Sequence, residues 1–326
     1  PDWVVGTSIG AVNAAIIAGN PTATCVERMH DFWRRVAHGD LVDMRQVPDP
    51  ARRFNTWWAT VDAALAGVPG FFAPRPFNPF LAGLPVAPEQ ASFYDASGLA
   101  ATLTRLVDFE HLRAPEAIRL TVNAMCVTTG DFASFDSARQ RVGVEHIMAS
   151  SALPPGFAPV RIDNHLYWDG GLYSNTPLAV VLDDEPRVNT LCFMVDLWRA
   201  EGPEPQTLEE VHTRQKDITY ASRSQRHIDE FRRLHKLRNA LHAVHARLPP
   251  KLRAAPHLRE LAAGACSTTM HIVHLRYGGQ DWQMAGKDVN FSRGSIEWRW
   301  RQGYADALRA AEAAAWLAPQ PPDVGV

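Results

Sequence analysis

Short apolar runs alternate with longer amphipathic stretches along much of the chain. Residues 4–7 form a short β-branched run that turns through glycine into an apolar helix ending near residue 19. Nearly continuous apolar runs at residues 118–127 and 190–195 predict buried strands of a mainly parallel sheet, and a further strand is expected over residues 271–275. Strands that alternate with helices predict an α/β fold.

Two amphipathic helices are predicted among these strands. The first spans residues 25–36 and places its apolar side chains on one stripe, formed by Val26, Met29, Phe32, Trp33 and Val36. The second spans residues 97–107 and has Leu99, Leu103 and Leu106 on its inward face. Both helices are therefore expected to pack on the core.

The turn at residues 6–10 reads Gly-Thr-Ser-Ile-Gly between a strand and a helix, which is the layout of a nucleophile elbow. Ser8 is therefore a candidate nucleophile. We expect Ser8 to have a positive φ, and we expect a Cβ at Gly6 or Gly10 to collide with neighbouring backbone. The helix start, at Ile9, would offer amide donors to an oxyanion. The alternative is a tight turn whose serine only caps the helix.

A second short apolar strand, over residues 166–168, leads into Asp169, Gly170 and Gly171. Asp-Gly is a common turn dipeptide, so this segment taken alone fits an ordinary turn. Nothing catalytic is required of it on that interpretation.

Together, the segments around Ser8 and Asp169 resemble the paired signatures of the patatin-like phospholipases. Residues 149–160 also resemble a segment that this family carries ahead of its aspartate. The resemblance covers residues 1–200 and implies a three-layer α/β fold around a mainly parallel sheet. Residues 201–326 resemble the C-terminal extension of some bacterial members, and we expect them to be helical and basic with a returning strand near residues 271–277.

The resemblance implies a serine acyl hydrolase, that is, a carboxylic ester hydrolase acting on a lipid or another ester without metal or organic cofactor. Ser8 would be the nucleophile of a Ser-Asp dyad and Asp169 its base, with an acyl-enzyme intermediate. Supporting roles at the turns and the oxyanion site would fall to Gly6, Ile9, Gly10, Gly170 and Gly171. An aspartate with an ordinary pKa near ~3.9 is a weak base at neutral pH. We therefore expect the pKa of Asp169 to be raised by an apolar surround from Tyr167, Trp168 and Leu172.

The sequence departs from the family pattern ahead of the elbow. The family places a glycine-rich oxyanion loop on the strand and helix that precede its nucleophile strand, and the printed sequence begins at Pro1, with five residues before Gly6. We therefore expect this chain either to be a fragment of a longer protein or to have lost the first strand and its helix, and in both cases the oxyanion loop is missing. Each missing oxyanion donor costs on the order of 100-fold to 1,000-fold in rate, so we expect the fragment to be impaired.

Composition fits a globular α/β protein. The chain has 326 residues, of which 46% are hydrophobic and 21% charged, enough to bury a sizeable core. The four cysteines form no Cys-x-x-Cys pair, so the sequence predicts neither a zinc site nor a redox motif. No apolar run reaches 18 residues and no signal peptide is evident. We expect a cytoplasmic protein.

Charge is segregated along the chain although the net charge is only −2. Residues 211–253 hold 11 Lys or Arg against three acids. Such a segment is either a solvated helix face or a surface that contacts anionic lipid headgroups, which would make the protein membrane-peripheral. Nucleic acid is not expected as a partner, because no nucleic-acid-binding motif accompanies the charge.

Three alternatives remain open from the sequence. His271 or His274 could complete a Ser-His-Asp triad with Ser8 and Asp169, in the chain order of α/β-hydrolases. The chain could also be a non-catalytic lipid-surface or assembly module. Residues 54–88, rich in aromatics and proline, are either a cap that binds acyl chains or an excursion that packs its rings onto the core.

Overall fold

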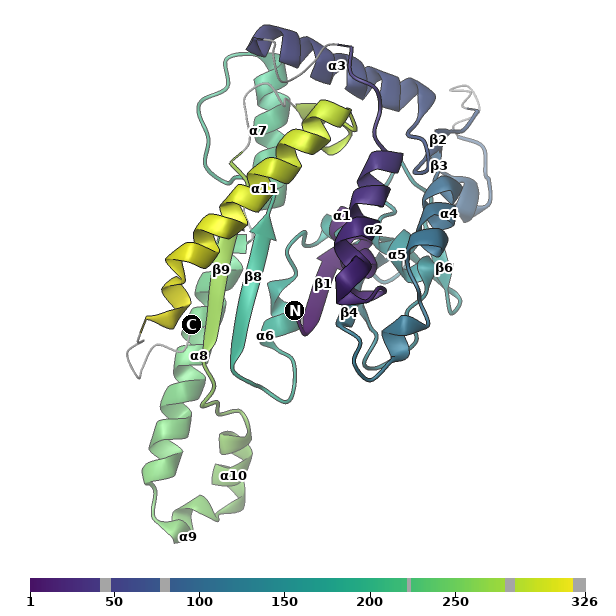
Figure 1. The fold of residues 1–326 in the computed structure, drawn as a ribbon. Coiled ribbons are helices and arrows are strands. Elements are labelled where there is room, and N and C mark those ends of the chain that lie inside the picture. Colours follow the sequence, from purple (N-terminus) through teal and green to yellow (C-terminus); the bar gives the residue numbers. More distant parts are fainter. Residues whose placement is uncertain (42–47, 77–82, 222–223, 279–284, 319–326) are drawn as a thin grey trace. The chain divides into compact units, whose positions relative to one another are not determined.

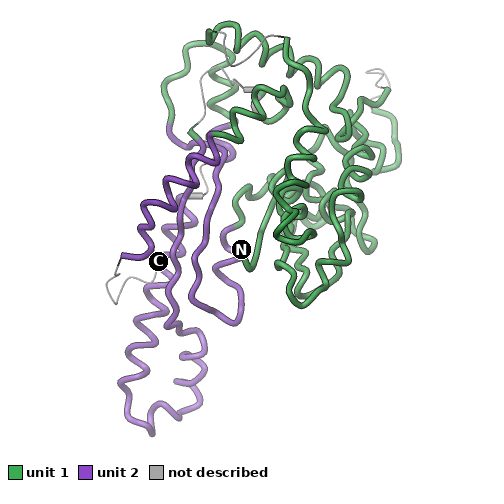
Figure 2. Tube along the Cα trace, in the orientation of Figure 1, with its two compact units in different colours: residues 1–177, 202–216, 278–301 green, residues 178–201, 217–277, 302–326 purple. Residues whose placement is uncertain are grey.

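The computed structural model describes residues 1–41, 48–76, 83–221, 224–278 and 285–318. The chain divides into two compact units, which Figure 2 distinguishes by colour. The first unit comprises Pro1–Pro177, Gly202–Lys216 and Gly278–Arg301, and the second comprises Leu178–Glu201, Asp217–Tyr277 and Gln302–Val326. Both contain strands and helices, so the predicted α/β class is confirmed.

The first unit carries the elbow (Figure 1). Its strands are β1 (Trp3–Thr7), β2 (Ala73–Pro74), β3 (Tyr94–Asp95), β4 (Arg119–Cys126), β5 (Phe132–Asp136), β6 (Val160–Ile162) and β7 (His165–Asp169). Its helices are α1 (Ile9–Ala18), α2 (Thr22–Arg35), α3 (Asp49–Ala66), α4 (Ser97–Leu106) and α5 (Val144–Ser150). The longer helices α7 (Leu208–Ala221) and α11 (Arg293–Ala313) begin in this unit and end in the second.

A five-stranded sheet organises the first unit. Strand β1 is parallel to β4, whereas β5 and β7 pair with β4 in antiparallel orientation and β6 pairs with β7 in the same way. The short connections β4–β5 and β6–β7 are hairpins, which can only make antiparallel pairs. The parallel pair of β1 and β4, which bears the elbow, thus lies within a mixed sheet, and β1 stands at the end of its strand order.

The core lies on one face of this sheet. Helices α1 and α5 contact each other and both pack against β4. The interior includes Val12 and Ile16 from α1, Leu120 and Val122 from β4, and Ile147 from α5, all fully buried. The strongly apolar sequence of α1 therefore reflects burial on most of its sides.

Helices α2 and α4 follow their predicted patterns with one exception. Leu99, Leu103 and Leu106 of α4 are buried, as are Met29, Phe32 and Val36 from the predicted stripe at α2. Val26 is 60% exposed, and Cys25 is buried instead. The inward stripe runs through residues 25, 29, 32 and 36, so position 26 lies about 100° further round the helix.

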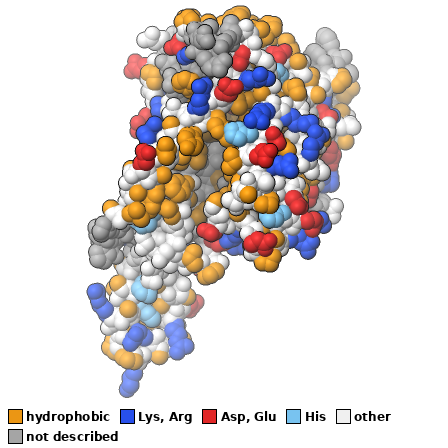
Figure 3. Space-filling model, viewed as in Figure 1, with side chains coloured by type: hydrophobic (Ala, Val, Ile, Leu, Met, Phe, Trp, Pro, Cys, Tyr) orange, Lys and Arg blue, Asp and Glu red, His pale blue; other side chains and the backbone are white. Residues whose placement is uncertain are grey.

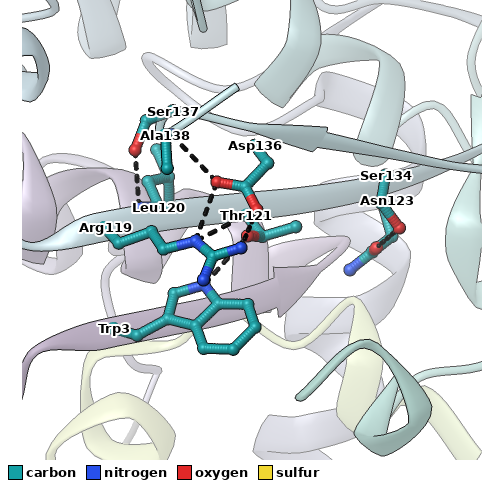
Figure 4. A network of polar contacts seen from close by, with 9 residues as sticks. All are labelled: Trp3, Arg119, Leu120, Thr121, Asn123, Ser134, Asp136, Ser137 and Ala138. Atoms are coloured by element: carbon teal, nitrogen blue, oxygen red, sulfur yellow. Dashed lines mark hydrogen bonds and ion pairs between the residues drawn. The ribbon is translucent and has the colours of Figure 1, made fainter. Parts of the chain in front are cut away.

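The opposite face of the sheet carries a polar network (Figure 4). The Arg119 guanidinium lies over the Trp3 ring, 3.9 Å from its centroid, and its Nε lies 3.0 Å from Oδ1 of Asp136. Trp3 Nε1 donates to Thr121 Oγ1 at 2.9 Å. Burial raises the pKa of Asp136, but hydrogen bonds from Arg119 and the Ala138 amide outweigh it and hold that pKa below its usual value. This network ties β1, β4 and β5 together.

The second unit is built on a two-stranded parallel sheet of β8 (Thr190–Asp196) and β9 (Met270–Arg276). Its helices are α6 (Leu178–Leu182), α8 (Ser224–Arg247), α9 (Pro250–Arg253) and α10 (Pro256–Ala263). The core of this unit joins Leu178, Leu182, Met194, Ile228, Phe231 and Met270. The sequence predicted strands at both β8 and β9, and a helical, basic segment where α7 and α8 lie.

Strand β8 differs from its prediction in burial. We expected residues 190–195 to be buried on both faces, as in the interior of a parallel sheet. Instead, Leu191, Phe193 and Val195 are 43 to 58% exposed, while Met194 is buried against the core of the unit. A two-stranded sheet packed on helices through one face leaves alternate side chains on the other.

Candidate active site

Ser8 lies at a sharp turn between β1 and α1. Its backbone has φ 57° and ψ −128°, a positive-φ conformation that is rare for a residue with a side chain. Only a glycine fits two residues earlier, because a Cβ on Gly6 would lie 2.4 Å from the Gly10 carbonyl oxygen. The elbow geometry is thus present, and Gly6 has the role the sequence predicted.

The prediction for Gly10 was wrong. A Cβ built on Gly10 meets no described atom within 4 Å, apart from its chain neighbours and the local helix backbone. The close contact of the turn is made by the backbone of Gly10 against Gly6, so a side chain at position 6 is excluded and one at position 10 is not.

The pairing of β1 and β7 with β4 places Asp169 next to Ser8. Thr7, the last residue of β1, pairs with Asn123, and Asp169, the last residue of β7, pairs with the next residue, Ala124. Strand β5 occupies the other edge of β4 at these positions, so β1 and β7 share one edge. Since β1 is parallel to β4 and β7 is antiparallel, their carboxyl ends point at each other.

The Ser8 side chain lies beside the Asp169 carboxylate and lowers its pKa by hydrogen bonding. Asp169 is 1% exposed. Burial raises the pKa of Asp169 to about 7, although hydrogen bonds from the Ser8 hydroxyl and the Gly171 amide lower it. A carboxylate with this pKa can take up a proton at neutral pH, as a general base must.

A different close neighbour excludes a side chain at each of the two glycines after Asp169. The Gly171 amide donates to Asp169 Oδ1 at 2.7 Å, and a Cβ on Gly171 would lie 2.5 Å from Oδ1 of Asn175. A Cβ on Gly170 would lie 2.5 Å from the Asn123 carbonyl oxygen. The segment is a turn, as the plainer interpretation holds, and it also orients the carboxylate.

The predicted apolar surround of Asp169 is only partly present. Tyr167 and Trp168 are half-buried, but Leu172 is 45% exposed and does not shield the carboxyl group as expected. Leu172 ends the short 3-10 turn that follows Asp169, and this turn directs its side chain towards solvent. Asp169 is instead buried by its place inside the sheet, beside Ala124.

The sequence did not single out Ser150 and Ser151 as separate site residues. The Ser8 amide donates to both the carbonyl oxygen and the Oγ of Ser150, at 3.1 Å each. Ser151 Oγ donates to the Ser8 carbonyl oxygen at 3.3 Å. A pair of adjacent serines carries no distinctive signal in the sequence, so only the fold reveals these contacts.

Amides at the start of α1 are candidates to hold an oxyanion. The Ser8 amide is occupied by Ser150. The amides of Ile9 and Gly10, in the first turn of α1, make no backbone hydrogen bond to any residue that the structure describes. They also lie at the positive end of the helix dipole.

A pocket of about 140 Å³ adjoins the segment that contacts Ser8. Ser151 and Ala152 form part of its wall, and its other lining residues include Phe71, Tyr94, Leu99, Met148, Phe157 and Val160. The lining is mainly apolar but also includes Arg75, Glu89 and Asp95, and it reaches the segment that contacts Ser8 and Asp169 rather than these two residues themselves.

Part of the aromatic segment at residues 54–88 packs its rings onto the core, as one of the two interpretations expects. Phe71 and Phe72 pack into the core, and Phe71 also lines the pocket. Phe54, Trp57 and Trp58 of α3 are 42 to 56% exposed. Phe77 and Phe80 lie outside the described residues.

The histidines of the alternative triad both lie in the second unit, where His274 has polar neighbours. His274 Nε2 lies 3.5 Å from Asp196 Oδ2, and its Nδ1 accepts a hydrogen bond from Arg276. His271 lies on β9, opposite Leu191 of β8. Within the described part of the chain, no histidine is a hydrogen-bond partner of Ser8 or Asp169.

No helix among the described residues is both long enough and apolar enough to cross a bilayer.

Comparisons with known proteins agree with the sequence signatures. Residues 1–182 match the family described as "Patatin-like phospholipase", and residues 218–323 match one described as "Patatin phospholipase". No curated protein matches the chain. Among solved structures, VipD from Legionella pneumophila aligns with a TM-score of 0.31 and 11% identity over 93% of this chain, which spans 61% of the VipD chain. Because the first family match covers more than half of its residues, the chain belongs to the patatin-like phospholipase family.

Proposed function

We propose that this protein hydrolyses a carboxylic ester of a lipid through an acyl-enzyme, with Ser8 as nucleophile and Asp169 as its base. The observation that carries the proposal is the position of the Ser8 side chain, at a positive-φ elbow, beside the buried Asp169 carboxylate, to which the pairing of β1 and β7 with β4 brings it. Family membership supports a lipid substrate.

The first half of the reaction transfers the acyl group to the protein. As Ser8 Oγ attacks the ester carbonyl carbon, its proton passes to Asp169. The carbonyl oxygen becomes an oxyanion, which the Ile9 and Gly10 amides at the start of α1 stabilise. The intermediate then expels the alcohol, which takes the proton from Asp169.

The second half releases the acid by the same route. Asp169 accepts a proton from a water molecule as the water oxygen attacks the acyl carbon. The second intermediate collapses, the carboxylic acid leaves, and Ser8 Oγ recovers a proton from Asp169. Each step uses Asp169 alternately as base and acid, which suits a carboxyl group with a pKa of about 7.

A lipid substrate lies in a membrane surface. The basic helices give the protein positive charge with which to bind a surface that is anionic. Arg247, Lys251 and Arg253 are exposed at and beyond the end of α8. Figure 3 shows Lys and Arg side chains gathered over the end formed by α8 and α9. We propose that this end contacts anionic headgroups.

The test is labelling of the wild-type protein with a fluorophosphonate, followed by assays on short p-nitrophenyl esters and on phospholipid vesicles. We expect labelling at Ser8, its loss in Ser8→Ala, and at least a 100-fold slower rate in Asp169→Asn, whose side chain cannot accept the proton. The control is Ser137→Ala, because Ser137 Oγ accepts the Leu120 amide in the same sheet without contact to Ser8. A wild-type protein that neither labels nor hydrolyses these esters would favour the non-catalytic module.

His271→Ala and His274→Ala decide between the dyad and the triad. The dyad predicts that both variants label at the wild-type rate, because neither histidine is a hydrogen-bond partner of Ser8 or Asp169 within the described residues. Loss of labelling in either variant would replace the dyad by the Ser-His-Asp alternative.

A further inference from the structure

We propose that Ser150 and Ser151 are positioning residues that clamp the backbone of Ser8 and so set the geometry of the dyad. The proposal rests on the proposed function of Ser8 and Asp169, and it concerns the segment that holds them.

The clamp grips both polar groups of the Ser8 backbone. The Ser8 amide donates to Ser150 through two acceptors at 3.1 Å, and the Ser8 carbonyl accepts from Ser151 Oγ at 3.3 Å. Ser150 is fully buried. The Ser8 carbonyl also accepts the amides of Ala11 and Val12, which begin the hydrogen bonding of α1.

The next residue of the same segment holds the other member of the dyad. The Asp169 amide donates to the Ala152 carbonyl at 3.0 Å. Three consecutive residues, 150 to 152, therefore bind the backbones of both Ser8 and Asp169. Their position is fixed in turn by α5, which ends at Ser150 and packs against α1, β4 and β7.

Such a clamp has a physical task at this turn. A non-glycine residue with positive φ costs on the order of 1 to 3 kcal/mol and persists only where its surroundings over-determine it. Without the Ser151 hydroxyl, Ser8 loses one of the hydrogen bonds that hold its backbone, and its Oγ would shift relative to the carboxylate. A shift of about 1 Å in a reacting group costs up to about 100-fold in rate.

The experiment compares Ser150→Ala and Ser151→Ala with Ser137→Ala in the full chain. Ser137 is the matched control because its hydroxyl also accepts a backbone amide of the sheet. Two quantities are measured, namely the rate of fluorophosphonate labelling as a function of pH and the urea midpoint of unfolding. Ser151→Thr, which keeps the hydroxyl beside the pocket, tests rescue.

We expect labelling to slow by about 10-fold to 100-fold in Ser150→Ala and in Ser151→Ala. Ser137→Ala should lose stability but label normally, and Ser151→Thr should recover most of the rate. The pH midpoint of labelling should also rise in the clamp variants, because a weaker hydrogen bond from Ser8 no longer lowers the pKa of Asp169.

Two results would overturn the clamp while leaving the dyad intact. One is wild-type labelling rates in both alanine variants, and the other is an equal loss of rate in Ser137→Ala, which would indicate a general effect of stability. A wild-type protein that does not label at all would instead contradict the proposed function.

Discussion

Thr7 and Asp169 pair with consecutive residues of one strand, Asn123 and Ala124 of β4, and approach them from opposite directions. The carboxyl ends of β1 and β7 thus meet along one edge of β4. Ser8 follows Thr7 directly, so the hydroxyl and the carboxylate come within hydrogen-bonding reach although they are far apart in sequence. A shift of either strand by one residue would turn its side chains to the other face and separate the pair.

The first prediction concerns the pH dependence of labelling. In the proposed mechanism, Asp169 must be ionised to take the Ser8 proton, and its pKa is about 7. We therefore expect the rate to fall as the pH drops below 7, with a midpoint near that value. A pH series with a neutral fluorophosphonate measures it. A midpoint near 4 would mean that the base is an ordinary exposed carboxylate.

The second prediction is that Asp169→Asn stabilises the protein at alkaline pH. The pKa of Asp169 is about 7 in the folded chain against an ordinary value of 3.8, so between these values the folded state holds a proton that the unfolded state releases. The free energy of unfolding should fall as pH rises through this window, at up to about 1.4 kcal/mol per pH unit from this group.

Urea unfolding at pH 4 and pH 8 measures the free energy of unfolding of Asp169→Asn and of the wild type. Asp169→Asn should exceed the wild type in stability at pH 8, and the gap should close near pH 4. The same gap at both pH values would show that the substitution acts through packing rather than through the buried charge.

The third prediction contrasts two glycines of the elbow. Gly6→Ala places a Cβ 2.4 Å from the Gly10 carbonyl oxygen and should abolish labelling and lower stability by several kcal/mol. Gly10→Ala should fold normally and gain about 0.5 to 1 kcal/mol, since alanine suits a helix better than glycine does. Thermal unfolding of the two variants compares them, and equal losses would contradict the open space at Gly10.

The fourth prediction concerns the polar network of Figure 4. Asp136→Asn should destabilise the protein by about 2 to 3 kcal/mol at pH 7, because it weakens the charged hydrogen bonds from Arg119. The pKa of Asp136 is lowered, so its contribution is present above the ordinary value of 3.8 and is lost as the pH falls through the lower folded value. Unfolding of both proteins from pH 7 down to pH 2 should show the gap shrinking.

The fifth prediction tests the basic end of the second unit. Reversing Lys251 and Arg253 to glutamate should weaken binding to vesicles that contain anionic lipid by about 1 kcal/mol or more for each charge. Added salt should weaken wild-type binding in the same way. The control reverses Arg28 and Arg34, which are exposed on α2. Equal loss in both double variants, or binding that salt does not change, would remove the headgroup contact.

The sequence alone determined the features that depend on neighbouring residues. A β-branched run, small residues and an apolar helix follow one another around Ser8, so local sterics dictated the strand, the elbow and the need for Gly6. The period of Leu99, Leu103 and Leu106 likewise defined the buried face of α4. The α/β class followed from the alternation of such elements, and the signatures at Ser8 and Asp169 indicated the family.

Only the tertiary structure decided what depends on long-range pairing. Asp-Gly-Gly forms a turn in many proteins, and here the register of β4 brings that turn to Ser8 and buries Asp169. The sequence could not predict three further features either. These are the open space at Gly10, the exposure of Val26, and the hydrogen bonds of Ser150 and Ser151 to Ser8. Each depends on which distant backbone lies next to a residue, and that is set by the packing of whole elements rather than by local propensity.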